Sequence, residues 1–170
     1  MFNLINKPLN RFNRISLIAL AFFATSILAQ SLTAQANPWV DIRKQRINQL
    51  LPNALKAAEV DAWLIICREN NNDPLADHIG CENAGAPAAY LFYLNDKGFH
   101  SLVYSPSSES TALSEMNLHD KVVAVPRGES AVDKVAKFIK QQNFKRIAIN
   151  TSFHNAQADG LSYTQRLALE

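Results

Sequence analysis

The feature that most constrains the fold is a run of six apolar residues, AWLIIC, at Ala62–Cys67, directly after Asp61. A strand with one solvent-exposed face alternates apolar and polar residues, whereas this run contains no polar position. Such a strand has to be covered on both faces. The run therefore predicts a buried strand in a sheet with helices packed on it, which is an α/β fold.

The first 36 residues have the pattern of a secretory signal peptide. Basic residues precede an apolar stretch at Ile15–Leu28, and no acidic residue occurs before Asp41. The stretch is too short for a comfortable membrane span, and Ala34 and Ala36 lie just before a predicted cleavage site ahead of Asn37. No cysteine follows the stretch, which argues against a lipoprotein anchor; an uncleaved anchor helix is the alternative. We expect a periplasmic or secreted protein without a stable membrane anchor.

The leader also explains the basic charge balance of the chain. The whole sequence has 17 Lys+Arg and 15 Asp+Glu. Three of the bases, Lys7, Arg11 and Arg14, belong to the leader, which leaves 14 bases and 15 acids in the remaining 134 residues. A nucleic-acid partner requires a concentrated basic face, and none is visible here. The remaining length is enough for one domain with a hydrophobic core.

A helix is expected from Pro38 to about Ala58, with Asn37 as its cap. Pro52 inside this helix predicts a kink or a break, because proline has no N–H to donate. The predicted apolar stripe of the helix consists of Ile47, Leu50, Leu51, Ala54 and Leu55.

The rest of the chain alternates between strand and helix patterns. Two apolar runs, 88–95 and 99–105, are joined by DKG with Gly98 available for a positive φ, which predicts a β-hairpin. A capping pattern at Ser130 and Asp133 predicts a helix through about Gln142. The inner face of that helix is expected to consist of Val132, Val135, Ala136 and Ile139. A short helix within 107–116 and strands at 121–125 and 146–150 complete a mixed β-sheet with flanking helices.

The last ten residues, 161–170, begin a helix with a capping-box pattern at Ser162 and Gln165. Two interpretations are open: a short terminal helix, or a sequence that stops within an element. We favour the second, because Leu167 and Leu169 are offered to nothing further in the chain.

In this order, three segments resemble the amino-terminal domain of the creatinase/prolidase/Xaa-Pro aminopeptidase superfamily. They are RINQLLPNALKAAEVDAWLIICRENNNDPLADHIGCENAG, the hairpin FYLNDKGFHSLVYS, and RIAINTSFHNAQADGLSYTQ. The resemblance runs from about Val40 to Glu170, and DAWLIICREN and ADGLS are its most specific pieces. It implies a domain over 37–160, followed at 161–170 by a helix leading toward a catalytic domain that this sequence does not contain.

The resemblance implies that the missing domain has the "pita-bread" fold. In the peptidase members that domain binds two divalent metals through two aspartates, a histidine and two glutamates, and hydrolyses peptides, often beside proline. The amino-terminal domain contributes oligomer contacts and restricts access to the active site. We therefore expect a homo-oligomer with a peptide substrate, the divalent metal pair in the missing domain, and no cofactor, metal ligand or catalytic residue in this chain. The alternatives are a free-standing exported binding or interaction domain, and part of a metal-free, creatinase-like hydrolase.

The polar segment CRENNNDPLADHIGCE, residues 67–82, carries most of the chemically able side chains. Its metal-ligand types are Asp73, Asp77, His78, Glu82 and the cysteines Cys67 and Cys81. One histidine and two distant cysteines do not match the spacing of a zinc site. The structural alternative is a short helix that is capped by Asp73, begins at Pro74 and ends at Gly80.

Nucleophilic catalysis has little support in the sequence. No G-x-S-x-G elbow occurs, and we interpret His100, His119 and His154 as surface or cap residues. Export would permit a disulfide between Cys67 and Cys81. The pairing stays open, because the sequence does not give the Cα separation that a bridge requires.

The functional candidates are Arg68, Glu69 and Asn70, at the exit of the predicted buried strand, where α/β folds expose residues to a ligand. One interpretation is a local ion pair that holds the loop. The other is that these residues face the catalytic cavity of this or a neighbouring subunit and bind the ends of a short peptide. A second polar group, Asp159, Gly160 and Ser162, is expected to form a turn and a helix cap.

Overall fold

The computed structural model describes residues 38–70, 72–81, 85–155 and 158–170. The predicted signal peptide and the predicted cap at Asn37 lie outside the described residues. The segment Pro38–Glu170 is a compact unit by itself.

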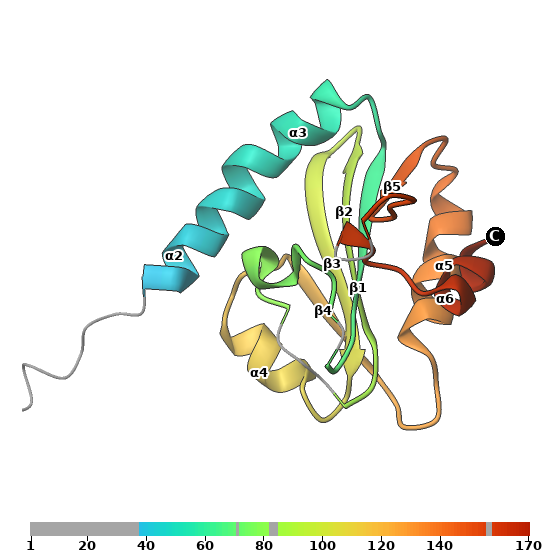
Figure 1. The fold of residues 1–170 in the computed structure, drawn as a ribbon. Coiled ribbons are helices and arrows are strands. Elements are labelled where there is room, and N and C mark those ends of the chain that lie inside the picture. The colour runs from blue at the N-terminus through green and yellow to red at the C-terminus, as the bar shows by residue number, and fades with distance from the viewer. Residues whose placement is uncertain (1–37, 71, 82–84, 156–157) are drawn as a thin grey trace, which may run out of the picture. The chain divides into compact units, whose positions relative to one another are not determined.

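A mixed five-stranded sheet organises this unit (Figure 1). Its strands are β1 (Ala62–Cys67), β2 (Ala88–Asn95), β3 (Gly98–Pro106), β4 (Lys121–Val125) and β5 (Ile147–Ile149), in the spatial order β4-β3-β2-β1-β5. The pairs β1–β2 and β2–β3 are antiparallel, whereas β3–β4 and β1–β5 are parallel. The predicted mixed sheet with flanking helices is confirmed.

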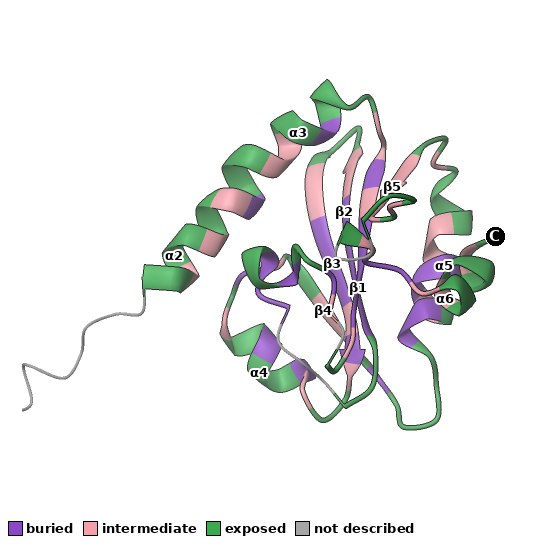
Figure 2. Cartoon of the chain, viewed as in Figure 1, coloured by how far each residue is buried: buried purple, intermediate pink, exposed green. Residues whose placement is uncertain are grey.

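Strand β1 is buried on both faces, as its composition requires. Ile65 and Cys67 belong to the core on one face of the sheet, and Leu64 and Ile66 belong to the core on the other. All four are at most 1% exposed. Figure 2 shows this buried interior along the sheet, with the exposed positions on the outer sides of the helices.

Helices cover both faces (Figure 1). The helical elements are α2 (Pro38–Gln45), the π-helical segment η1 (Arg46–Leu50), α3 (Leu51–Ala57), the 3₁₀ helix η2 (Ala76–Ile79), α4 (Ser110–Glu115), α5 (Ala131–Gln142) and α6 (Tyr163–Leu169). Helices α2, α3 and α4 lie on one face of the sheet, and α5 and α6 lie on the other. Within the described residues, no helix combines the length and the apolar character that a bilayer span requires.

Pro52 is accommodated without a break in the helix. The N–H of Leu51 donates to the carbonyl of Arg46, five residues earlier, which is the bond of a π-helix. Pro52 then falls in the first turn of α3, where the missing N–H costs little. The prediction was a kink or a break; the helix does not break, and the interruption takes the form of a π-helical turn.

The π-helical turn also changes the predicted apolar stripe. Ile47 and Leu55 are buried, but Leu50 is 63% exposed and Ala54 is exposed as well. A π-helical turn holds more residues than an α-helical turn, so a stripe with a 3.6-residue period is not kept on one face through it. Leu50 of η1 and Ala54 of α3 therefore form an apolar surface that the sheet does not cover.

The capping and turn signals are confirmed elsewhere. The Ser130 hydroxyl accepts the N–H of Asp133 at 3.1 Å and starts α5, and Gly98 has the positive φ of 117° that the hairpin turn requires. Within α5, the predicted inner residues Val132, Val135 and Ala136 are buried, and Ile139 packs against them partly buried.

Candidate functional site

The chemically richest part of the described chain is the edge where β1 and β5 end. These two strands are parallel, so the residues that follow them, Arg68 after β1 and Asn150 after β5, leave the sheet at the same end. The segment that begins at Arg68 and the segment that begins at Asn150 therefore lie side by side, although they are far apart in the sequence.

Arg68 ties these two segments together. Its side chain is half-buried, and Nη2 donates to the carbonyl of Gly160 at 3.0 Å. Its backbone N–H donates to Oδ1 of Asn72 at 3.1 Å. No ion pair joins Arg68 to Glu69, both of which the structure describes. Arg68 therefore holds the loop through the carbonyl of Gly160 and not through an ion pair with Glu69.

Glu69 and Asn70 are exposed beside this anchor. Asn70 has a φ of 61°, a left-handed conformation that asparagine tolerates better than most residues. The backbone therefore turns sharply at the end of β1 and leaves both side chains in solvent. They are available for contact with another surface.

Asp73 is the buried acid of the site, with 3% exposure. Its carboxylate accepts Nδ2 of Asn150 at 2.8 and 2.9 Å, one bond to each oxygen, and Oδ1 also accepts the N–H of Leu75 at 2.9 Å. Asn150 in turn accepts Nε1 of Trp63 at 3.1 Å. The amide of Asn150 thus satisfies a buried carboxylate and a tryptophan N–H at once.

Gly160 closes the same network. Its N–H donates to the carbonyl of Asn150 at 2.9 Å. A Cβ placed on Gly160 would lie 1.8 Å from Oδ2 of Asp73, so only glycine fits there without displacing the carboxylate. Oδ1 of Asp159 accepts the N–H of Ser152 at 2.6 Å. The predicted cap is present, since Ser162 forms a complete capping box at the start of α6.

Sequence reasoning missed Asn150 as the partner of Asp73, and Trp63 as the partner of Asn150. The only signal was the position of Asn150 at the end of a predicted strand that runs parallel to β1. The short helix was also misplaced, because the 3₁₀ helix begins at Ala76 rather than at Pro74. Its predicted end is right: Gly80 has a φ of 73°.

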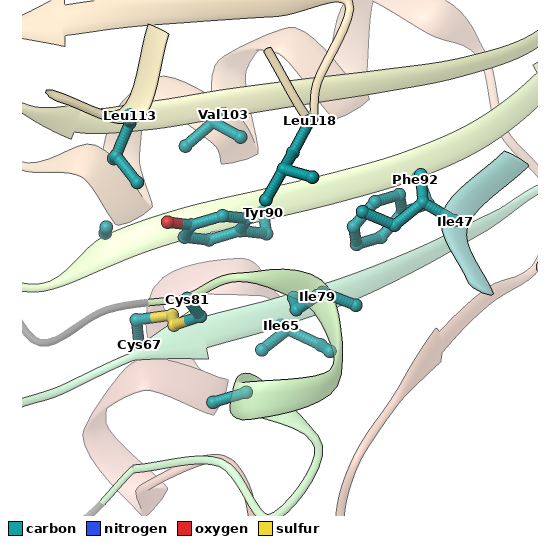
Figure 3. Close-up of a cluster of buried hydrophobic side chains, with 12 residues drawn as sticks. Ile47, Ile65, Cys67, Ile79, Cys81, Tyr90, Phe92, Val103, Leu113 and Leu118 are labelled. Atoms are coloured by element: carbon teal, nitrogen blue, oxygen red, sulfur yellow. A yellow bond between two sulfur atoms is a disulfide. The ribbon is translucent and has the colours of Figure 1, made fainter. Parts of the chain in front are cut away.

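The structure pairs Cys67 and Cys81 in a disulfide, with a Cα–Cα distance of 6.2 Å. Both cysteines are buried, next to Tyr90 in the core on the α2–α4 face (Figure 3). The bridge fastens the end of β1 to the end of η2. In this state neither sulfur is a nucleophile.

The other candidate metal ligands of the polar segment 67–82 do not point toward one common site. Nδ1 of His78 lies 2.6 Å from Nη1 of Arg46; since a guanidinium only donates, Nδ1 accepts this hydrogen bond. Asp77 is exposed, and its backbone carbonyl accepts Nε of Arg43 at 2.8 Å. Glu82 lies outside the described residues. Within the described part of the chain, no group of three or more His, Cys, Asp or Glu is arranged to hold a metal ion.

The other histidines lie apart from this edge and from one another. His119 packs against Tyr90 and Phe92. Burial lowers its pKa to about 4, an effect larger than the opposing influence of the Ile79 backbone and of Asp120, so its ring is neutral at pH 7. His100 lies 3.0 Å from Oδ1 of Asn95 at the hairpin turn, and His154 is exposed. These positions do not form a catalytic triad.

This chain is similar to known proteins in its fold, but a match by sequence was not found. No protein-family model matches this chain, and no curated protein matches it. Solved structures do match. The N-terminal domain of Xaa-Pro dipeptidase from Lactobacillus brevis aligns with 71% of this chain and 82% of its own, at 14% identity and a TM-score of 0.51.

Two further structures carry related names. Xaa-Pro aminopeptidase (aminopeptidase P) from Streptococcus thermophilus aligns over 74% of this chain and 82% of its own, at 13% identity and a TM-score of 0.51. Xaa-Pro dipeptidase from Bacillus anthracis aligns over 76% of this chain at 15% identity and a TM-score of 0.51, but over only 30% of its own length. The chain therefore has the α/β fold seen in the N-terminal domains of Xaa-Pro peptidases.

Proposed function

We propose that this chain is the non-catalytic amino-terminal domain of an exported metallopeptidase of the Xaa-Pro aminopeptidase type, a member of the creatinase/prolidase superfamily. The observation that carries the proposal is the fold match to an N-terminal domain of Xaa-Pro dipeptidase over 82% of that domain. The order of motifs along the sequence supports it independently. The parent reaction would be attack of metal-activated water on a peptide carbonyl, in a separate carboxy-terminal domain.

The strand exit is the part of the domain that we assign to active-site access. Arg68 is anchored to Gly160, while Glu69 and Asn70 are exposed on a sharply turned backbone. A rigid support under exposed polar side chains suits a wall that contacts a short peptide without taking part in the chemistry. The disulfide at Cys67 and the buried Asp73 network supply that rigidity.

Export is the second part of the proposal. The leader has the composition of a signal peptide, and a disulfide persists in an oxidising compartment but rarely in the cytosol. The chain expressed with its leader in a secreting bacterium should be recovered outside the cytoplasm with Asn37 as its first residue. A protein retained in the cytoplasm with its leader intact would contradict export.

The enzymatic part is tested with the purified chain. Incubated with Mn²⁺ or Zn²⁺ and short Xaa-Pro peptides, it should release no amino acid, and calorimetry should find no stoichiometric binding of either metal. Metal-dependent hydrolysis that survives repurification would overturn the non-catalytic assignment. Hydrolysis of a small guanidino compound without metal would instead favour a creatinase-like hydrolase.

A further inference from the structure

Strands β3 and β4 end side by side, and a crevice opens beyond their ends. The two strands are parallel, and Pro106 at the end of β3 pairs with Val125 at the end of β4, so both connections leave the sheet at the same level. The connection after β3 leads to α4 on one face of the sheet, whereas the connection after β4 leads to α5 on the other face (Figure 1). In open α/β sheets, such a divergence at the carboxyl ends of neighbouring strands is where ligands bind.

The crevice has the size and the lining of a small-molecule site. Its volume is about 780 Å³, within the usual range for such sites. Its floor is apolar and consists of Val125, Ala131 and Val132, each at most 7% exposed. Ser107 and Ser108 line its rim, and neither hydroxyl group is hydrogen-bonded to another group of the described chain. The crevice can therefore hold an apolar body and fix it through polar contacts at the rim.

Two unpaired charges of opposite sign line the crevice from its two sides. Glu109 belongs to the connection after β3, and Arg127 belongs to the connection after β4. Neither forms an ion pair with the other or with any other residue that the structure describes. The third charged residue of the rim, Glu129, is already paired with Lys134. The crevice thus presents one carboxylate and one guanidinium to a ligand.

The surroundings of these two charges favour specific partners. Glu109 is half-buried, and burial raises its pKa by more than the hydrogen bond from the Gly85 backbone lowers it. Because burial disfavours the ionised carboxyl group, an ammonium group beside it would stabilise the charge. Arg127 is exposed, and its planar guanidinium matches the geometry of a carboxylate. A ligand with only one of these two charges would leave the other side of the crevice without a partner.

We propose that this crevice binds a small zwitterion, and that its simplest ligand is a free amino acid with a bulky apolar side chain. The ammonium group of the ligand contacts Glu109, and the Ser107 hydroxyl accepts a second hydrogen bond from it. The carboxylate of the ligand contacts Arg127, and its side chain lies on the apolar floor. The inference does not rest on the proposed function, because it involves neither the strand exit at Arg68 nor peptide hydrolysis.

Three forms of one probe test the proposal on the full chain. L-Phenylalanine carries both charges, N-acetyl-L-phenylalanine keeps only the carboxylate, and L-phenylalaninamide keeps only the ammonium group. In an NMR titration, L-phenylalanine should bind and shift the amide signals of Gly128 and Val132, which line the crevice. Each blocked form should bind roughly tenfold more weakly or worse, because it loses one charged hydrogen bond.

Two variants assign the contacts. Glu109→Gln should weaken L-phenylalanine binding by roughly tenfold and should not weaken binding of the N-acetyl form. Arg127→Gln should weaken L-phenylalanine binding by a similar factor and should not weaken binding of the amide form. The matched controls are Glu115→Gln on α4 and Lys137→Gln on α5, exposed positions outside the crevice, and both should bind L-phenylalanine like the wild-type chain.

Several results would overturn the proposal. One is the absence of L-phenylalanine binding at millimolar concentration, and another is equal binding of all three forms, which would leave only apolar contact. An N-acetyl form that binds as tightly as L-phenylalanine would make the crevice an anion site instead. The comparison of the three forms uses the wild-type chain, so it decides the question even if a variant fails to fold. None of these results bears on peptidase activity, so they are separable from the proposed function.

Discussion

Removing the Cys67–Cys81 disulfide should lower the free energy of unfolding, because the unfolded chain then gains conformational entropy. The two cysteines are 14 residues apart in the sequence, and a closed loop of that size stabilises a fold by about 3 kcal/mol, mainly by restricting the unfolded chain. For a domain of this length, the same loss lowers the melting temperature by roughly 10 °C. Both sulfurs are buried, so a reductant should act only when the chain unfolds.

The assay is equilibrium denaturation in urea, followed by fluorescence, with and without reductant. Reduction of the wild-type chain keeps both sulfur atoms and removes only the cross-link, which isolates the entropic contribution. The variant Cys67→Ala/Cys81→Ala should be insensitive to reductant and at least as unstable as the reduced wild type. Equal midpoints with and without reductant, or two free thiols in the unreduced, denatured chain, would refute the reasoning.

Three further predictions concern the hydrogen-bond network of Asp73 and the ring of His119. Gly160→Ala should lower the free energy of unfolding by about 1–3 kcal/mol, because the added Cβ would clash with the Asp73 carboxylate. The control in the same urea titration is Gly85→Ala, which should be nearly neutral because a Cβ there has open space. Asn150→Ala should cost about 2–3 kcal/mol by leaving buried Asp73 without two hydrogen bonds, and an unchanged urea midpoint would disprove this. His119 has a pKa of about 4 when folded and an ordinary value near 6.5 when unfolded, so the unfolded chain binds the proton first on acidification. Stability should therefore fall by about 2 kcal/mol between neutral pH and pH 5, and His119→Leu should remove most of that slope; a pH profile identical to wild type would contradict it.

Elements that depend on interactions between residues close in the sequence could be predicted from the sequence alone. Strand β1 was recognisable because a continuous apolar run has no face to present to water, and α5 because Ser130 and Asp133 sit at cap spacing. The terminal capping box at Ser162 was recognisable for the same reason. In each case the determining interactions lie within a few residues of one another.

The errors arose where long-range packing decides. Pro52 predicted an interruption of the helix. Whether the chain breaks, kinks or forms a π-helical turn there depends on how the helix packs on the rest of the fold. The Asp73–Asn150 hydrogen bonds join residues 77 positions apart, and the spacing of residues in the sequence does not predict a contact at that separation. The two cysteines were recognised as residue types, yet only the fold brings their Cα atoms to 6.2 Å.

We propose that this domain precedes a catalytic domain in its parent protein. The most direct measurement is the sequence of the gene transcript beyond the codon for Glu170, together with the mass of the protein in its native cells. We predict roughly 200 or more further residues, an ordinary domain length, carrying two aspartates, a histidine and two glutamates as metal ligands. A transcript whose reading frame stops at Glu170, with a native protein of matching mass, would contradict the claim and favour a free-standing binding domain.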